Sequence, residues 1–173
     1  MRKSTKELAL SSLMAALGVV FLCLGGIIPF ALYACPILAS AVLLPVREDC
    51  RRSYAWCCYA VIAVLGLLLG PDKEASSLFL FLGYYPLIKP KLDTIGNPVV
   101  RILCKLIIAT AAIGAMYAVL LYVFCLAAVV QEFAETAPWM LWTTAGLGLL
   151  LFAVYDVLLG RIALFYRARR KKA

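Results

Sequence analysis

The sequence predicts an all-α integral membrane protein, a bundle of six transmembrane helices with both termini in the cytoplasm. Of its 173 residues, 65% are hydrophobic and 15% are charged, whereas a soluble domain is about half apolar and about a quarter charged. The stretch from Leu8 to Val46 carries no charge. At about 1.5 Å per residue, it is too long for one helix through a hydrocarbon core about 30 Å thick. We therefore expect two crossings within it.

The charged segments between the apolar runs predict the topology. All but one of the 17 Lys and Arg residues lie in four segments, which are 1–6, 47–52, 89–105 and 161–172. The intervening gaps, 72–74 and 132–135, hold acidic residues and the remaining Lys73. Because short loops rich in Lys and Arg stay in the cytoplasm, this alternation predicts six crossings of the cell membrane.

The apolar runs form a single membrane domain over residues 1–173. The predicted crossings are 8–28, 30–45, 54–70, 75–88, 99–130 and 138–160, followed by a basic cytoplasmic tail at 161–173. The first crossing ends at the Gly25-Gly26 turn signal, and the sixth begins at Pro138, a residue type favoured in the first turn of a helix. The second contains Pro36, which a membrane helix tolerates when its neighbours satisfy the freed carbonyl.

The fourth crossing is the shortest of the six. Residues 75–88 would reach only about 21 Å as a helix, so the segment either spans the core by drawing in its flanks or is partly re-entrant. The charge pattern favours a full span, because otherwise Lys89 and Lys105 would lie outside.

The segment from Gly83 to Asp93 contains two prolines, Pro86 and Pro90. Prolines break or end helices, so we expect a broken helix exit anchored in the cytoplasm by Lys89 and Lys91. The alternative is a mobile gate at Gly83 and Pro86.

Small residues four apart predict faces for close helix contact. On the first crossing, Ser11 pairs in this way with Ala15, and Ser12 with Ala16. Such a face either packs within the bundle or receives another protein.

Asp156 lies inside the sixth apolar run. Ionisable groups within a membrane are costly and are usually paired or functional. We expect Asp156 to pair with Lys105 or Arg101 on the fifth crossing, as a clasp between the two helices. A proton or ion relay is the alternative.

A second candidate site lies at the predicted outer end of the bundle. Apolar walls with a few polar groups are typical of a small-molecule pocket. The residues expected to bind a substrate are Asp72, Lys73, Glu74, Tyr117, Tyr122 and Trp142. The alternative for the aromatic residues is an interfacial belt.

Several function classes lack the residues that they require. The chain has no His, so it holds no Ser-His or Cys-His nucleophile pair and no His-Glu-x-x-His zinc motif. It also lacks a Gly-x-x-x-x-Gly-Lys loop for ATP. The net charge of +8 is spread over helix ends, where it meets lipid headgroups rather than nucleic acid. We expect a protein that is not an enzyme and has no cofactor or metal.

The predicted architecture resembles the substrate-binding S subunit of energy-coupling factor (ECF) vitamin transporters. The resemblance rests on four features: the size of the chain, the six predicted crossings, the small-residue face at residues 11–16 and the missing ATP-binding loop. The family typically has Ala-x-x-x-Ala on its first helix, where this chain has Ser-x-x-x-Ala. The resemblance implies a vitamin-like ligand, a transmembrane coupling subunit that meets the first helix, and ATPase subunits. Alternatives are a small membrane scaffold without transport activity and a stand-alone carrier driven by an ion gradient.

Overall fold

Helices make up the fold of this protein. The structure is a computed structural model that describes residues 3–26, 31, 33–122 and 138–170. Among these residues every regular element is a helix. Four helices are long and apolar enough to cross a membrane, and their candidate spans are Thr5–Gly25, Arg52–Leu69, Pro98–Val119 and Gly146–Tyr166. The chain is therefore a multi-pass α-helical membrane protein, which confirms the predicted class.

The four long helices correspond to the first, third, fifth and sixth predicted crossings. They are α1 (Lys3–Gly25), α4 (Arg52–Leu69), α7 (Pro98–Tyr122) and α9 (Pro138–Arg170). Helix α9 continues ten residues beyond the predicted end at 160, because nothing in 161–170 breaks a helix. Residues 123–130 of the predicted fifth crossing lie outside the described residues.

The second predicted crossing is interrupted. It consists of α2 (Ala34–Ala41) and α3 (Leu43–Asp49). Pro45 has no N–H for the Ala41 carbonyl, and its ring crowds that carbonyl. Val42 between the two helices keeps helical dihedral angles (φ −61°, ψ −24°), so the interruption is local.

The fourth predicted crossing is divided by the same mechanism. Helix α5 (Lys73–Leu82) and helix α6 (Tyr85–Asp93) are separated at Gly83 and Tyr84. Pro86 cannot donate to the Leu82 carbonyl, so α5 ends there. The two pieces extend beyond both ends of the predicted range 75–88, which makes the segment longer than expected.

The main core lies between α1, α2–α3, α4 and α5. Leu22, Leu43, Ile62 and Phe79 are almost completely buried in it. Helices α1 and α4 approach closely because glycines face large side chains. A Cβ on Gly18 would lie 2.6 Å from Cδ1 of Ile62.

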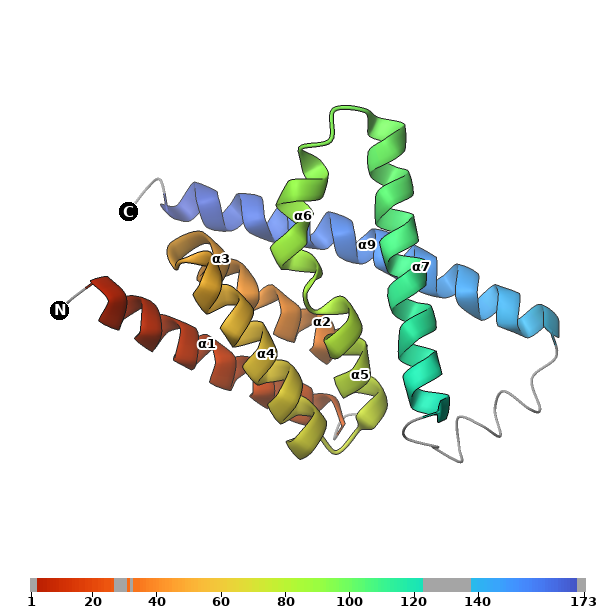
Figure 1. Ribbon diagram of the computed structural model, residues 1–173, viewed down its shortest axis with the longest axis horizontal. Helices are drawn as coiled ribbons and strands as arrows, with labels where there is room; N and C mark the ends of the chain where they lie inside the picture. The colour runs from red at the N-terminus through yellow and green to blue at the C-terminus, as the bar shows by residue number, and fades with distance from the viewer. Residues whose placement is uncertain (1–2, 27–30, 32, 123–137, 171–173) are drawn as a thin grey trace.

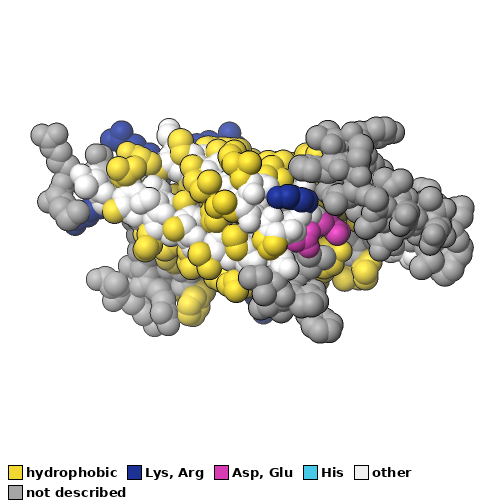
Figure 2. Space-filling model, turned by 90° about the horizontal axis from the view of Figure 1, so that it is seen from below, with side chains coloured by type: hydrophobic (Ala, Val, Ile, Leu, Met, Phe, Trp, Pro, Cys, Tyr) yellow, Lys and Arg dark blue, Asp and Glu magenta, His cyan; other side chains and the backbone are white. Residues whose placement is uncertain are grey.

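A second core joins α6, α7 and α9. It contains the buried residues Tyr85, Ala109, Phe152 and Leu159. Helix α9 passes behind α6 and α7 in Figure 1, and the first residues of α1 lie at the same end of the molecule as the last residues of α9. Figure 2 shows one face of the molecule as largely hydrophobic, with its visible acidic side chains gathered in one small patch.

Candidate functional site

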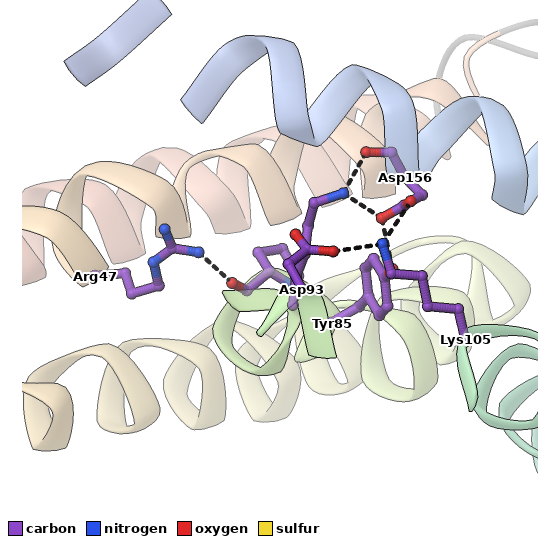
Figure 3. Close-up of polar contacts among 7 residues, drawn as sticks. Arg47, Tyr85, Asp93, Lys105 and Asp156 are labelled. Carbon is purple, nitrogen blue, oxygen red and sulfur yellow. Dashed lines mark hydrogen bonds and ion pairs between the residues drawn. The ribbon is translucent and has the colours of Figure 1, made fainter. Parts of the chain in front are cut away.

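A polar cluster lies where α6, α7 and α9 meet, and Asp156 of α9 is at its centre. One carboxylate oxygen of Asp156 accepts hydrogen bonds from the Lys89 ammonium and, at 2.6 Å, from the Tyr85 hydroxyl. The other lies 2.9 Å from Nζ of Lys105. Figure 3 shows the side chains converging from the three helices. Asp156 therefore joins α9 to α6 and α7.

The cluster balances its charges. Lys105 also pairs with Asp93 at 2.7 Å, so two ammonium groups face two carboxylates. The Lys89 and Lys105 side chains are only 11% and 13% exposed. Buried charges are costly unless they are paired and hydrogen-bonded. The described contacts provide such partners for each charge, so the arrangement can crosslink three helices.

The structure gives Lys89 a partner that the sequence did not predict. The sequence predicted a cytoplasmic anchor at this residue, and in the structure it is only 9% exposed. Its ammonium also donates to the main-chain oxygen of Asp156 at 2.6 Å and lies 5.9 Å from the centre of the Tyr85 ring. The short helix α6 turns Lys89 toward α9, whereas Lys91 remains exposed.

Of the two cations proposed as partners for Asp156, the structure brings only Lys105 to it. The described contacts include no ion pair of Arg101. Arg101 lies one helical turn before Lys105, nearer the start of α7. That turn separates it from the carboxylate.

Arg47 of α3 donates a hydrogen bond to a main-chain carbonyl of α6 that has no helical partner. Pro90 has no N–H, so the carbonyl four residues earlier, on the buried Pro86, receives no helical hydrogen bond. Nη1 of Arg47 donates to this carbonyl at 2.7 Å (Figure 3), and Nη2 pairs with Glu48. The two interrupted segments are thereby bonded to each other.

Two tyrosines of α9 bind the N-terminal helices. The Tyr155 hydroxyl donates to Oγ of Ser40 in α2 at 2.7 Å. The Tyr166 hydroxyl donates to the carboxylate of Asp49 at the end of α3. Polar bonds thus connect α9 to four other helices.

The acidic and basic residues of the predicted substrate site hold helix ends. Asp72 caps α5 by accepting from the Glu74 N–H at 2.8 Å. The Lys73 ammonium donates to the Leu67 and Gly70 carbonyls at 2.7 and 3.1 Å, at the end of α4. Glu74 accepts from the Tyr33 hydroxyl at 3.4 Å. These side chains have local structural roles beside any role toward a ligand.

The aromatic residues of the predicted substrate site are not all described. Tyr117 is half-buried beside Leu78 and Met116, where α7 packs on α5. The side chains of Tyr122 and Trp142 lie outside the described residues. The structure therefore places one of the three aromatic side chains, at the junction of α5 and α7.

The small-residue face of α1 is divided between the inside and the outside of the bundle. Ser11 and Ala15 are 7% and 8% exposed, and the Ser11 carbonyl accepts from the Cys58 thiol. Ser12 and Ala16 are exposed. Only the second pair is accessible to another protein.

Sequence reasoning missed Tyr85, Lys89 and Asp93 as members of the polar cluster. The spacing of Pro86 and Pro90 was the available signal, because it forces a short helix with an unsatisfied carbonyl and one Lys between the prolines. Among the described residues, no group of three His, Cys, Asp or Glu side chains could hold a metal ion.

Comparisons of the chain with protein-family models, curated proteins and solved structures gave no match. Function is consequently inferred from the residues and their geometry.

Proposed function

We propose that this chain is the membrane-embedded, small-molecule-binding subunit of a multi-subunit, ATP-driven uptake transporter. In this proposal α2–α3 and α5–α6 each make one crossing, which gives six crossings with both termini in the cytoplasm. The position of the α1 start and the α9 end at the same end of the molecule supports an even number of crossings (Figure 1). The chain lacks an ATP-binding loop, so other subunits would hydrolyse ATP.

The exposed face of α1 carries the proposal. Ser12 and Ala16 lie on it four residues apart, beside Leu13 and Val20, which are 66% and 52% exposed. The Ser12 hydroxyl donates to the Ala9 carbonyl of its own helix at 3.1 Å. Its hydrogen bond is therefore made within α1, and a second helix can pack closely against this face without supplying an acceptor. Lipid gives no hydrophobic reward for helix association, and small residues permit the close contact that replaces it. This face suits a transmembrane coupling subunit.

The ligand would bind at the end of the bundle that holds the α4–α5 turn. Tyr33 lies on an accessible part of this end, because it is 46% exposed. Its hydroxyl donates a hydrogen bond to Glu74. Asp72 and Lys73 fix the ends of α5 and α4 beneath it. We assign polar ligand contacts to residues 72–74. The ring-stacking contacts are assigned to Tyr117, Tyr122 and Trp142.

Purification from the native membrane in a gentle detergent tests this function. Mass spectrometry would identify proteins and small molecules that accompany the wild-type chain and a Ser12→Leu, Ala16→Leu variant. The matched control replaces Ala111 and Ala115 with Leu, because these residues are also exposed and four apart on α7.

We expect ATPase and coupling subunits to accompany the wild type and the control, and to be lost from the α1 variant, while a bound metabolite remains. Loss of partners from both variants alike would contradict docking through α1. A wild-type chain that carries neither partner nor metabolite, yet complements its own deletion, would contradict the transporter-subunit function.

A stand-alone carrier is the second candidate, and the two interrupted segments favour it. Carriers often bind substrate where broken helices meet near the membrane midplane, and interruptions occur here at Val42 and at Gly83–Tyr84. The purified chain alone in liposomes would then accumulate substrate under an ion gradient. ATP-dependent uptake that requires added subunits would exclude this candidate.

A further inference from the structure

A cation-lined cleft opens between the end of α3, the start of α4 and α6. Its volume is about 270 Å³, slightly below the ~300–1,000 Å³ typical of pockets for drug-sized ligands. Arg47, Arg52 and Lys91 line it together with one carboxylate, Glu48. The cleft is distinct from the polar cluster around Asp156 and from the proposed ligand end at residues 72–74.

The charges of the cleft are unbalanced. Glu48 pairs with Arg47, which is also fixed by its bond to the Pro86 carbonyl. Arg52 and Lys91 are exposed, and neither forms an ion pair with any residue that the structure describes. Two like charges that face one cleft repel each other, and a bound anion relieves that repulsion.

The remaining walls suit a lipid. Ala55, Trp56 and Leu87 give the cleft an apolar side. Trp56, which is 37% exposed, is a residue type enriched where headgroups meet acyl chains. The three cations belong to the segments that the positive-inside pattern assigns to one membrane face, so the cleft lies at headgroup depth. Clusters of Lys and Arg at that depth attract anionic lipids.

We propose that this cleft binds the phosphate group of an anionic phospholipid. Arg52 and Lys91 bind the phosphate, Arg47 fixes the floor of the cleft, and Trp56 lies beside the glycerol and the first acyl carbons. The inference is independent of the transporter function, because it uses none of the residues assigned to substrate or partner.

Native mass spectrometry of the full chain in detergent tests this site. The probes are phosphatidylglycerol, phosphatidylcholine and glycerol 3-phosphate, each titrated separately. The variant carries Arg52→Gln and Lys91→Gln, both at exposed positions that leave Arg47 and its bonds intact. The control carries Lys6→Gln and Arg161→Gln, which remove the same charge from exposed positions outside the cleft.

We expect the wild type to prefer phosphatidylglycerol to phosphatidylcholine, and the cleft variant to lose about 30-fold in affinity for it, since each Lys or Arg at the surface contributes to binding of anionic lipid. The control should keep its affinity. Equal binding by variant and wild type, equal loss in the control, or no preference between the lipids would overturn the site. Glycerol 3-phosphate that displaces the lipid at equal concentration would overturn the assignment to a phospholipid.

Discussion

The N-terminal region, helices α1 to α4, and the C-terminal region, helices α6, α7 and α9, are held together by different interactions. In the first, small residues let helices touch, as where Gly18 of α1 faces Ile62 of α4. In the second, Asp156 binds Tyr85, Lys89 and Lys105 on two neighbouring helices. Lipid is as apolar as the helix surfaces, so helix association needs either close backbone contact or polar bonds. Close contact is the main device of the N-terminal region, and polar bonds are the main device of the C-terminal region.

The difference lies in how each region responds to a single change. A close contact between helices depends on the shapes of the facing side chains. When a larger side chain is introduced, its neighbour can change conformation and reduce the steric overlap. A buried ion cluster depends on the balance of its charges. The loss of the Asp156 carboxylate leaves Lys89 without its ion-pair partner, and only Asp93 then faces the two ammonium groups. We therefore expect the largest single-residue effects in the C-terminal region.

The replacement Asp156→Ala should have the largest effect. Removing one partner of a buried ion pair costs about 3–5 kcal/mol, so we expect the free energy of unfolding to fall by this amount. Titration with a denaturing detergent in micelles measures it. Adding Lys89→Met should recover part of the loss, because the unpaired cation is then gone, whereas Lys105 keeps its pair with Asp93. A clasp also predicts that Asp156→Asn lowers thermal stability. Unchanged assembly and stability with abolished activity would instead show a relay.

Arg47→Met should cost about 1.5–3 kcal/mol of unfolding free energy, since a charged donor to a buried carbonyl is lost. The same change should cost less in a Pro90→Ala background, where residue 90 supplies an N–H to the Pro86 carbonyl. The double-mutant cycle measures this coupling. Additive effects would mean that Arg47 acts through Glu48 alone.

Gly18→Ala should cost about 1–3 kcal/mol, the usual range for overpacking a core. The new Cβ would lie 2.6 Å from Cδ1 of Ile62, so Ile62→Val should restore part of the stability. Gly114→Ala is the control, because a Cβ there meets no described atom within 4 Å. Similar losses at Gly18 and Gly114 would argue against close α1–α4 contact.

Tyr155→Phe should cost about 1 kcal/mol, the net value of one ordinary hydrogen bond. It removes the bond to Ser40 and keeps the ring that packs 5.8 Å from Tyr85. Limited proteolysis should then cut the C-terminal part of α9 faster. Tyr155→Phe with no change in stability or cutting would show that packing alone holds α9 on α2.

The smallest effect is expected at Cys50, between α3 and α4. Burial, with the nearby carboxylates of Glu7 and Asp49, raises the pKa of its thiol. Less thiolate is then present at neutral pH, so maleimide should label a variant that keeps only Cys50 slowly, and faster as pH rises. Glu7→Gln should raise the rate at a fixed pH. A rate unaffected by Glu7→Gln would place that carboxylate away from the thiol.

Parts of the fold and of the polar cluster followed from local chemistry. Apolar length and charge-free runs predicted the helical membrane class and the approximate positions of α1, α4, α7 and α9. The prolines predicted the break at the end of α5. Asp156 stood out as an acid in an apolar run, and Lys105 was one of two proposed partners. The sequence analysis did not predict the interruption at Val42, which follows from Pro45 rather than Pro36, because Pro45 deprives the Ala41 carbonyl of its hydrogen bond.

The helix-forming segments and the sites where proline interrupts them depend on residues close together in the chain, so they can be predicted from the order of the residues. The partners of the buried polar groups depend on how the helices pack. Lys89 is a charged residue near a helix end in the sequence, and in the structure it is a buried partner of Asp156. That pairing depends on how α9 crosses α6, and residues far apart in the chain fix that crossing together. Local spacing carries no information about it.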